Sequence, residues 1–231
     1  MTMRLFELAT ANRTVRPSPF CWRARMALAH KGLEAEYLPV RFTEKEKIAF
    51  SGQKLVPVLC DGETTVADSW AIANYLEQHY PDRPHLFDCG QARAHALFID
   101  KWTQHSLHPG IFKQILLDLY ESLDEADKPY FRESREARVG TTLEAFVADA
   151  DERLPAFRAG LAPLQATLKA QDFLGGEAPS YADYIVFGAF QWARYSSPRR
   201  LVEAETPLAA WLERMQALHG GLGAEEPAAA G

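Results

Sequence analysis

The chain has 231 residues, 47% of them apolar, and its 31 acidic and 25 basic residues give a net charge of −6. This composition predicts a packed core and argues against a fibrous or disordered protein. The acidic balance offers no basic surface for nucleic acid, and no apolar run approaches a membrane span. Because Cys21, Cys60 and Cys89 stand at unrelated spacings, we expect no disulfide framework and a cytoplasmic location.

The first eighty residues alternate between strand and helix patterns. Their predicted order is β-α-β-α-β-β-α, over residues 4–9, 19–31, 36–42, 43–50, 56–60, 64–67 and 68–80. The fourth of these is a short polar helix or turn. Asp61-Gly62 joins the last two strands and is a strong hairpin signal. A helical crossover implies parallel pairing at the start of the sheet and the hairpin antiparallel pairing at its end, so we expect a thioredoxin-like α/β domain.

After Tyr80 the pattern changes to helices alone. Proline breaks the chain at Pro81 and Pro84, and a linker is expected over residues 81–90. An all-α domain is predicted over residues 91–219, with helices at about 91–120, 130–151, 157–171, 182–194 and 208–219. Ser180-x-x-Asp183 resembles a capping box at the start of the most apolar helix. A disordered tail is expected over residues 220–231, which are rich in Gly, Ala, Glu and Pro.

Ser18 precedes Pro19 at the start of the first predicted helix. A serine followed by proline is a common helix start, so capping alone explains the pair. The same position also suits an anion, because free N–H groups and the helix dipole meet there. A hydroxyl that donates to a thiolate supplies about 1.5–3 kcal/mol, enough to lower a thiol pKa by roughly two units. Ser18 is therefore a candidate for stabilising a thiolate supplied by another molecule.

Two further features fit a bound thiol peptide. Pro57 lies inside the strand pattern 55–59, where a missing N–H is anomalous, and a cis bond after Val56 would leave the Val56 backbone free to pair with a peptide. A proline on an edge strand is the alternative. Asp68-Ser69 opens the third helix as an ordinary cap, and the same groups suit the carboxylate and ammonium of a γ-glutamyl group.

These motifs together carry a family resemblance. Ser18-Pro19, Val56-Pro57 and Asp68-Ser69, followed by Phe173-Leu174-Gly175-Gly176 in the second half, resemble the cytosolic glutathione S-transferases. The resemblance is greatest to the bacterial β-aryl etherases and the fungal FuA-type serine transferases. It implies a thioredoxin-like glutathione-binding domain over residues 1–80, an all-helical substrate-binding domain over residues 91–219, glutathione as co-substrate, no metal, and a homodimer.

The resemblance also implies roles for single residues. Ser18 would stabilise the glutathione thiolate, and Val56, at the Pro57 bond, would pair with the cysteinyl backbone. Asp68 and Ser69 would take the γ-glutamyl end, and Lys54 would meet the glycyl carboxylate unless it is simply solvated.

The acceptor side of the site is less specified by the sequence. Trp102, His105, His108 and Phe112 fall on neighbouring turns of one helix and are candidate pocket residues, although a core face is the alternative. His105 and His108 are spaced i, i+3, but no third ligand suggests a metal site.

The leading hypothesis is a glutathione transferase whose bound thiolate attacks an electrophilic, aromatic substrate, with β-aryl ether cleavage as one version. Cys21, three residues after Ser18, is a candidate accessory thiol or an inert packing group. If it is reactive, the protein is instead a glutathione-dependent thiol-disulfide oxidoreductase. A non-catalytic carrier of aromatic ligands is the remaining alternative.

Overall fold

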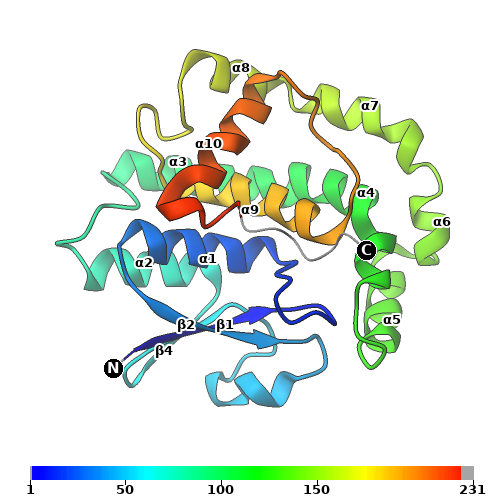
Figure 1. The fold of residues 1–231 in the computed structure, drawn as a ribbon, viewed down its shortest axis with the longest axis horizontal. Coiled ribbons are helices and arrows are strands. Elements are labelled where there is room, and N and C mark those ends of the chain that lie inside the picture. Colours follow the sequence, from blue (N-terminus) through cyan, green and yellow to red (C-terminus); the bar gives the residue numbers. More distant parts are fainter. Residues whose placement is uncertain (1, 225–231) are drawn as a thin grey trace.

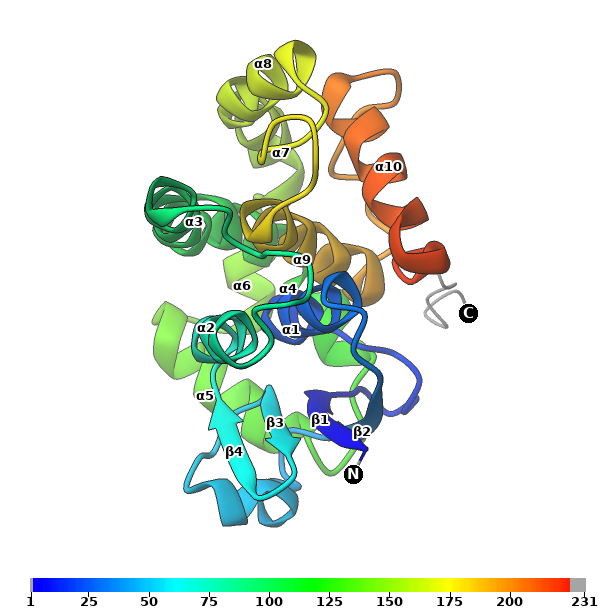
Figure 2. The same ribbon diagram turned by 90° about the vertical axis from the view of Figure 1, so that its left-hand side faces the viewer.

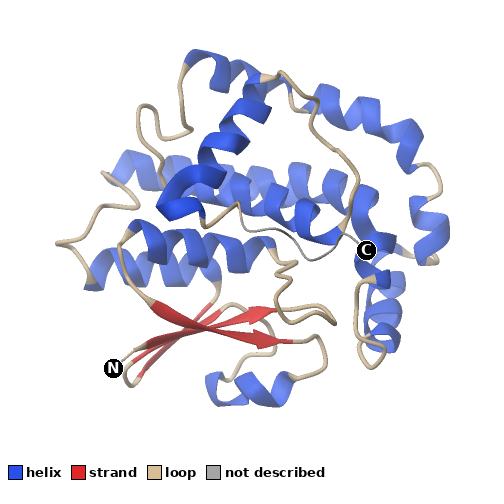
Figure 3. Ribbon diagram, in the orientation of Figure 1, coloured by secondary structure: helices blue, strands red, loops and turns tan. Residues whose placement is uncertain are grey.

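The computed structural model describes residues 2–224, and its first part is a four-stranded sheet in the order β2-β1-β3-β4 (Figures 1 and 3). β1 (Met3–Leu8) pairs in parallel with β2 (Ala35–Val40) and antiparallel with β3 (Val58–Asp61). β3 and β4 (Thr64–Ala67) form the antiparallel hairpin. The predicted mixed sheet and its pairing directions are therefore confirmed.

Helices α1 (Pro19–His30) and α2 (Ser69–His79) lie between this sheet and the second domain (Figure 2). The predicted polar helix or turn is a 3-10 helix, η1 (Lys45–Ser51), and it lies on the side of the sheet away from α1 and α2 (Figure 1). The order β-α-β-η-β-β-α agrees with the predicted thioredoxin-like domain. Because α1 is covered on both sides, its start is held at the junction of the two domains.

The rest of the described chain is helical, as expected. Its α-helices are α3 (Gly90–Trp102), α4 (His108–Glu121), α5 (Lys128–Val139), α6 (Leu143–Val147), α7 (Ala150–Gly160), α8 (Ala162–Ala170), α9 (Tyr181–Ser196) and α10 (Pro207–Gly221). A π-helical turn, η2 (Thr103–Leu107), joins α3 to α4, so the helix predicted over 91–120 has an interruption. The helix predicted over 130–151 is divided, because Gly140 has a positive φ of 75° and Thr142 caps a new helix.

The predicted tail lies partly outside the described residues. The Gly223 carbonyl accepts hydrogen bonds from Gln191 and Arg194, so residues up to Ala224 lie against α9. The disordered tail expected from Gly220 therefore does not begin there. Residues 225–231 lie outside the described part of the chain.

Helix α9 is the buried centre of the helical domain and packs directly on α1. Gly188 allows this approach, since a Cβ added there would lie 2.5 Å from the Pro19 carbonyl oxygen. The close contact holds the residue that follows Ser18. The placement of Ser18 therefore depends on a glycine in the other domain.

We expect Gly188→Ala to lower the free energy of unfolding by about 1–3 kcal/mol, because overpacking displaces the start of α1. Turnover per folded molecule should fall as well, since Ser18 moves with Pro19. Gly160→Ala is the matched control, because nothing lies within 4 Å of a Cβ at that helical position. Urea denaturation and steady-state kinetics on both variants test this, and a Gly188→Ala protein with unchanged stability would contradict it.

Candidate active site

A cleft of about 670 Å³ lies between the start of α1, the segment before β3, and helices α4 and α5. Its volume is that of an ordinary ligand pocket. In Figure 1, α5 (green) reaches from the helical domain to the level of the sheet, so both domains contribute walls. Ser18, Lys54 and Val56 line it from the first domain, and His108 and Phe112 from the second. Five of the predicted site residues therefore share one cavity.

Ser18 is the N-cap of α1 and is buried in the cleft wall, with 5% of its surface exposed. Its Oγ accepts a hydrogen bond from the Cys21 N–H at 3.3 Å. The capping interpretation is thus correct, and it coexists with access to the cleft. A ligand sulfur beside this hydroxyl would also face the positive end of the α1 dipole.

The Val56–Pro57 bond is cis, as predicted from the anomalous proline. Neither the backbone N–H nor the C=O of Val56 is hydrogen bonded within residues 2–224, so both can pair with a ligand backbone. The Pro57 carbonyl accepts from the Asp68 N–H at 3.2 Å, which brings the start of α2 beside this segment. The motifs at Pro57 and Asp68, which are separated along the sequence, are therefore neighbours in space.

Asp68 caps α2 through its Oδ1, which accepts from the Trp70 and Ala71 N–H groups at 2.9 and 3.1 Å. The Asp68 side chain is exposed, whereas Ser69 is buried, and the Tyr181 hydroxyl donates to the Ser69 carbonyl at 2.7 Å. Asp68 and Ser69 do not line the cleft itself. The Asp68 backbone is hydrogen bonded to Pro57, the residue that follows the cleft-lining Val56.

Cys21 is fully buried and accepts a hydrogen bond from the Leu8 N–H at 3.4 Å. Burial and the nearby Glu7 raise the pKa of its thiol to about 12, against the hydrogen bonds from Ser18 and Leu8. At pH 7 a thiol with that pKa is ionised to only about one part in 10⁵. The packing interpretation of Cys21 is the one that its surroundings favour.

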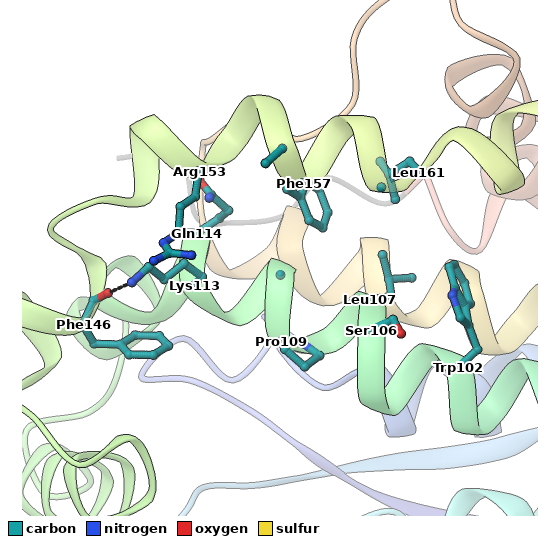
Figure 4. Close-up of a pocket in the computed structure, with 13 residues that line it drawn as sticks. Trp102, Ser106, Leu107, Pro109, Lys113, Gln114, Phe146, Arg153, Phe157 and Leu161 are labelled. Carbon is teal, nitrogen blue, oxygen red and sulfur yellow. Dashed lines mark hydrogen bonds between the residues drawn. The ribbon is translucent and has the colours of Figure 1, made fainter.

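The four residues predicted for the acceptor pocket are divided between different places. His108 and Phe112 line the cleft, whereas His105 is exposed and lines neither described cavity. Trp102 lines a second cavity of about 560 Å³ between α7 and the η2–α4 segment (Figure 4). In this second cavity the Lys113 ammonium donates to the Phe146 carbonyl and pairs with Asp149 at 2.5 Å, so its charge is already partnered.

Several cleft residues were not anticipated from the sequence. The walls are strongly aromatic, and beside the predicted Phe112 they include Phe20, Phe42, Tyr130, Phe131, Phe146 and Trp192. The His108 ring lies between the Phe20 ring, 5.5 Å away, and the Trp192 ring, 5.6 Å away. Because Phe20 is two residues after Ser18, this aromatic wall begins beside the candidate thiolate-stabilising hydroxyl. Such walls suit a planar aromatic ligand.

Four cations also line the cleft: Lys45, Lys54, Arg135 and Arg138. No aspartate or glutamate is among the described lining residues. The Lys45 ammonium lies 4.0 Å from the centre of the Tyr130 ring, which joins η1 to α5 across the cleft. The site is thus basic in an acidic protein, a property that favours anionic ligands.

Burial, together with the positive charge of Arg23, lowers the pKa of His108 to about 3. Its Nε2 has no hydrogen-bond partner within the described chain. Because the folded pKa lies below the ordinary value near 6.5, the unfolded chain binds the proton more readily and acid favours unfolding. As the pH falls from 6.5 to 5, we expect protonation of His108 in the unfolded chain to lower the free energy of unfolding by up to about 2 kcal/mol. The limiting slope is about 1.4 kcal/mol per pH unit.

Urea denaturation of the wild type and of His108→Gln at several pH values measures this contribution. The variant should lose stability less steeply as the pH falls. The pKa values of His30 and His219 are also lowered by burial, so the difference between the two proteins is the relevant quantity. Parallel stability curves would show that His108 does not carry the effect.

Two negative findings concern residues 2–224. No group of three or more His, Cys, Asp or Glu side chains there is arranged to hold a metal ion. None of the helices in the same range is both long and apolar enough to span a membrane.

Comparison with known proteins identifies relatives for both halves. Residues 14–84 match the family model of the glutathione S-transferase N-terminal domain, and residues 94–218 match that of the C-terminal domain. A zeta-class glutathione S-transferase from Euphorbia esula is 43% identical over 70 residues. That match covers 28% of this chain and 31% of the relative, so it spans less than a third of the relative's length.

Solved structures extend the likeness to the whole fold. Glutathione transferase GSTFuA3 from Phanerochaete chrysosporium is 26% identical, with a TM-score of 0.83 over 93% of this chain and 96% of that one. This match confirms the expected resemblance to FuA-type transferases. The β-etherase LigF from Sphingobium sp. strain SYK-6, at 22% identity, has the same fold with a TM-score of 0.67 over 94% of this chain and 96% of its own. With family models matched in both domains, the chain belongs to the glutathione S-transferase family.

Proposed function

We propose that this protein is a glutathione transferase in which the thiolate of bound glutathione attacks an electrophilic carbon of an aromatic substrate. The observation that carries the proposal is Ser18, which caps α1 in the wall of a cleft with aromatic sides. Its hydroxyl and the helix end together lower the pKa of a bound thiol. The remaining contribution is alignment of two reactants in one cavity.

Glutathione is held, in this proposal, along the first domain. Its cysteinyl backbone pairs with the free N–H and C=O of Val56, beside the Pro57 bond. The γ-glutamyl carboxylate meets the Ser69 end of α2, and its ammonium faces the exposed Asp68. The exposed Lys54 takes the glycyl carboxylate from the other side of Val56.

The finer version of the reaction is β-aryl ether cleavage. The sulfur of glutathione forms a bond to the carbon beside an aromatic ketone, and the carbon–oxygen bond breaks to release an aryloxide. The electron pair leaves with the aryloxide oxygen, so no oxidant is required. The aromatic walls around His108 fit a substrate with two aryl groups.

The test is incubation with glutathione and a panel of β-aryl ethers, halo-aromatics and disulfides, followed by mass analysis of the products. Thioether products from the first two classes support the proposal. Exchange with disulfides alone, lost in Cys21→Ser, would instead indicate a thiol-disulfide oxidoreductase, despite the burial of Cys21. Tight binding of aromatic ligands with no product from any class would indicate a carrier.

We also infer a cytoplasmic homodimer. Cys21, Cys60 and Cys89 are all unpaired, which fits a reducing compartment. On α3, the adjacent Leu97 and Phe98 expose 40% and 67% of their surfaces, an apolar pair suited to a subunit contact. Light scattering of the wild type and of Phe98→Glu tests the dimer, and a monomeric wild type would remove it.

A further inference from the structure

Two arginines of α5, Arg135 and Arg138, line the cleft without a carboxylate partner. Arg135 donates to the Ser134 hydroxyl at 2.9 Å, and its guanidinium lies over Phe42 and Phe131, 5.3 and 4.6 Å from the ring centres. The Arg138 guanidinium lies 5.6 Å from the centre of the Phe112 ring. Within residues 2–224, neither arginine forms a salt bridge.

Arg132, one turn earlier on the same helix, behaves differently. Its guanidinium pairs with Glu136 and Glu144, each at 2.8 Å, and it does not line the cleft. On α5, the arginine outside the cleft therefore has carboxylate partners, whereas the two arginines that line the cleft have none. Burial and the charge of Arg138 lower the pKa of Arg135, so holding both cations here is unfavourable without an anion.

The charges of glutathione do not account for all four cations of the cleft. Glutathione in its thiolate form carries two carboxylates, one thiolate and one ammonium, which leaves two net negative charges. Lys45 and Lys54, both from the first domain, are sufficient to balance those two charges. Arg135 and Arg138 come from the helical domain, on the side where Phe112 and Phe131 form the acceptor wall.

We propose that the acceptor substrate is an aromatic electrophile that carries a carboxylate, and that Arg135 and Arg138 bind this carboxylate. This inference rests on the proposed transferase function and specifies the substrate class for the same site. A planar guanidinium is suited to a carboxylate because it donates two parallel hydrogen bonds. The aromatic rings beneath both arginines hold the guanidinium planes in place and provide a surface for the aryl group.

A matched pair of acceptors tests the proposal. With 4-(chloromethyl)benzoate, the glutathione sulfur forms a bond to the benzylic carbon and the carbon–chlorine bond breaks, releasing chloride. Methyl 4-(chloromethyl)benzoate undergoes the same substitution without the negative charge. After subtraction of the uncatalysed rate, we expect the wild-type kcat/KM to be at least about tenfold higher for the acid, the effect of hydrogen bonds to a charged group.

Arg135→Gln and Arg138→Gln should each lower kcat/KM for the acid by about tenfold or more and change the value for the ester little. Arg132→Gln is the control on the same helix and should leave the ratio of the two values unchanged. Because Arg138 is exposed, we expect Arg138→Gln to fold. The Arg138→Gln variant therefore decides the test even if Arg135→Gln is unstable.

The outcomes separate the two proposals. No enzymatic turnover of either acceptor by the wild type counts against the transferase function itself. Turnover of both, with an acid-to-ester ratio near one or a ratio unaffected by Arg138→Gln, overturns the carboxylate proposal alone. If Arg135→Gln lowers kcat/KM equally for both acceptors, Arg135 maintains the structure of the cleft and does not recognise the substrate carboxylate.

Discussion

Ser18→Ala is expected to lower kcat for thioether formation by about 10–100-fold, the kinetic equivalent of losing one hydrogen bond to a charged sulfur. Without the hydroxyl the pKa of bound glutathione rises, so a smaller fraction is thiolate at neutral pH. The pH profile of kcat should therefore shift to higher pH, and turnover should recover in part as the pH is raised. Steady-state kinetics at saturating glutathione between pH 6 and pH 9 measure both effects.

The N-cap role of Ser18 needs a control of its own, because losing a cap costs about 0.5–2 kcal/mol of stability. Thr206 provides it, since it also precedes a proline and accepts from the Ala209 N–H at 3.2 Å at the start of α10. Thr206→Ala should destabilise the protein similarly without affecting turnover. If Ser18→Ala also leaves kcat and its pH profile unchanged, Ser18 has no part in the chemistry.

Asp183→Ala is expected to lower the free energy of unfolding by about 3–5 kcal/mol, the largest stability effect that we predict. The buried carboxylate accepts backbone hydrogen bonds from Leu174, Gly175 and Ser180, at 2.7 to 3.0 Å. It also accepts from the Trp211 indole at 3.0 Å. Truncation leaves these donors without partners in the core, and each such donor costs about 1–3 kcal/mol.

Asp172→Ala provides the comparison, because Asp172 is exposed on the loop that precedes α9. Asp172→Ala should change the free energy of unfolding by no more than about 0.5 kcal/mol. Chemical denaturation followed by tryptophan fluorescence reports both variants, since Trp211 lies beside Asp183. A loss of less than 1 kcal/mol in Asp183→Ala would mean that water or other groups replace the carboxylate.

The first domain could be predicted from sequence because its signals are local. Asp61-Gly62 marks the hairpin, Ser18-Pro19 marks a helix start, and Pro57 departs visibly from a strand pattern. The helical domain was predicted in outline, but its helix ends were not. Apolar residues continue past Gly140 and favour one long helix, whereas in the structure Gly140 ends α5 and Thr142 caps α6.

The acceptor side of the cleft could not be predicted for a geometric reason. A count of 3.6 residues per turn puts Trp102 and His105 on one helix face with His108 and Phe112. The π-turn η2 begins directly after Trp102, contains His105 and ends before His108, and it inserts about one extra residue, which rotates the following face by about 100° relative to Trp102. Trp102 therefore lines the second cavity, while Phe112 lines the cleft.

The packing of α1 between the sheet and α9 has a consequence for how the molecule unfolds. The buried Arg23–Asp100 ion pair, 2.5 Å between Nη1 and Oδ1, and the Tyr181–Ser69 hydrogen bond both cross the domain boundary. Separating the domains would expose a charged pair and the apolar faces of α1 and α9 together. The boundary near residue 85 therefore separates two different folds, but the two domains stabilise each other across it. We expect both domains to unfold together in a single cooperative transition.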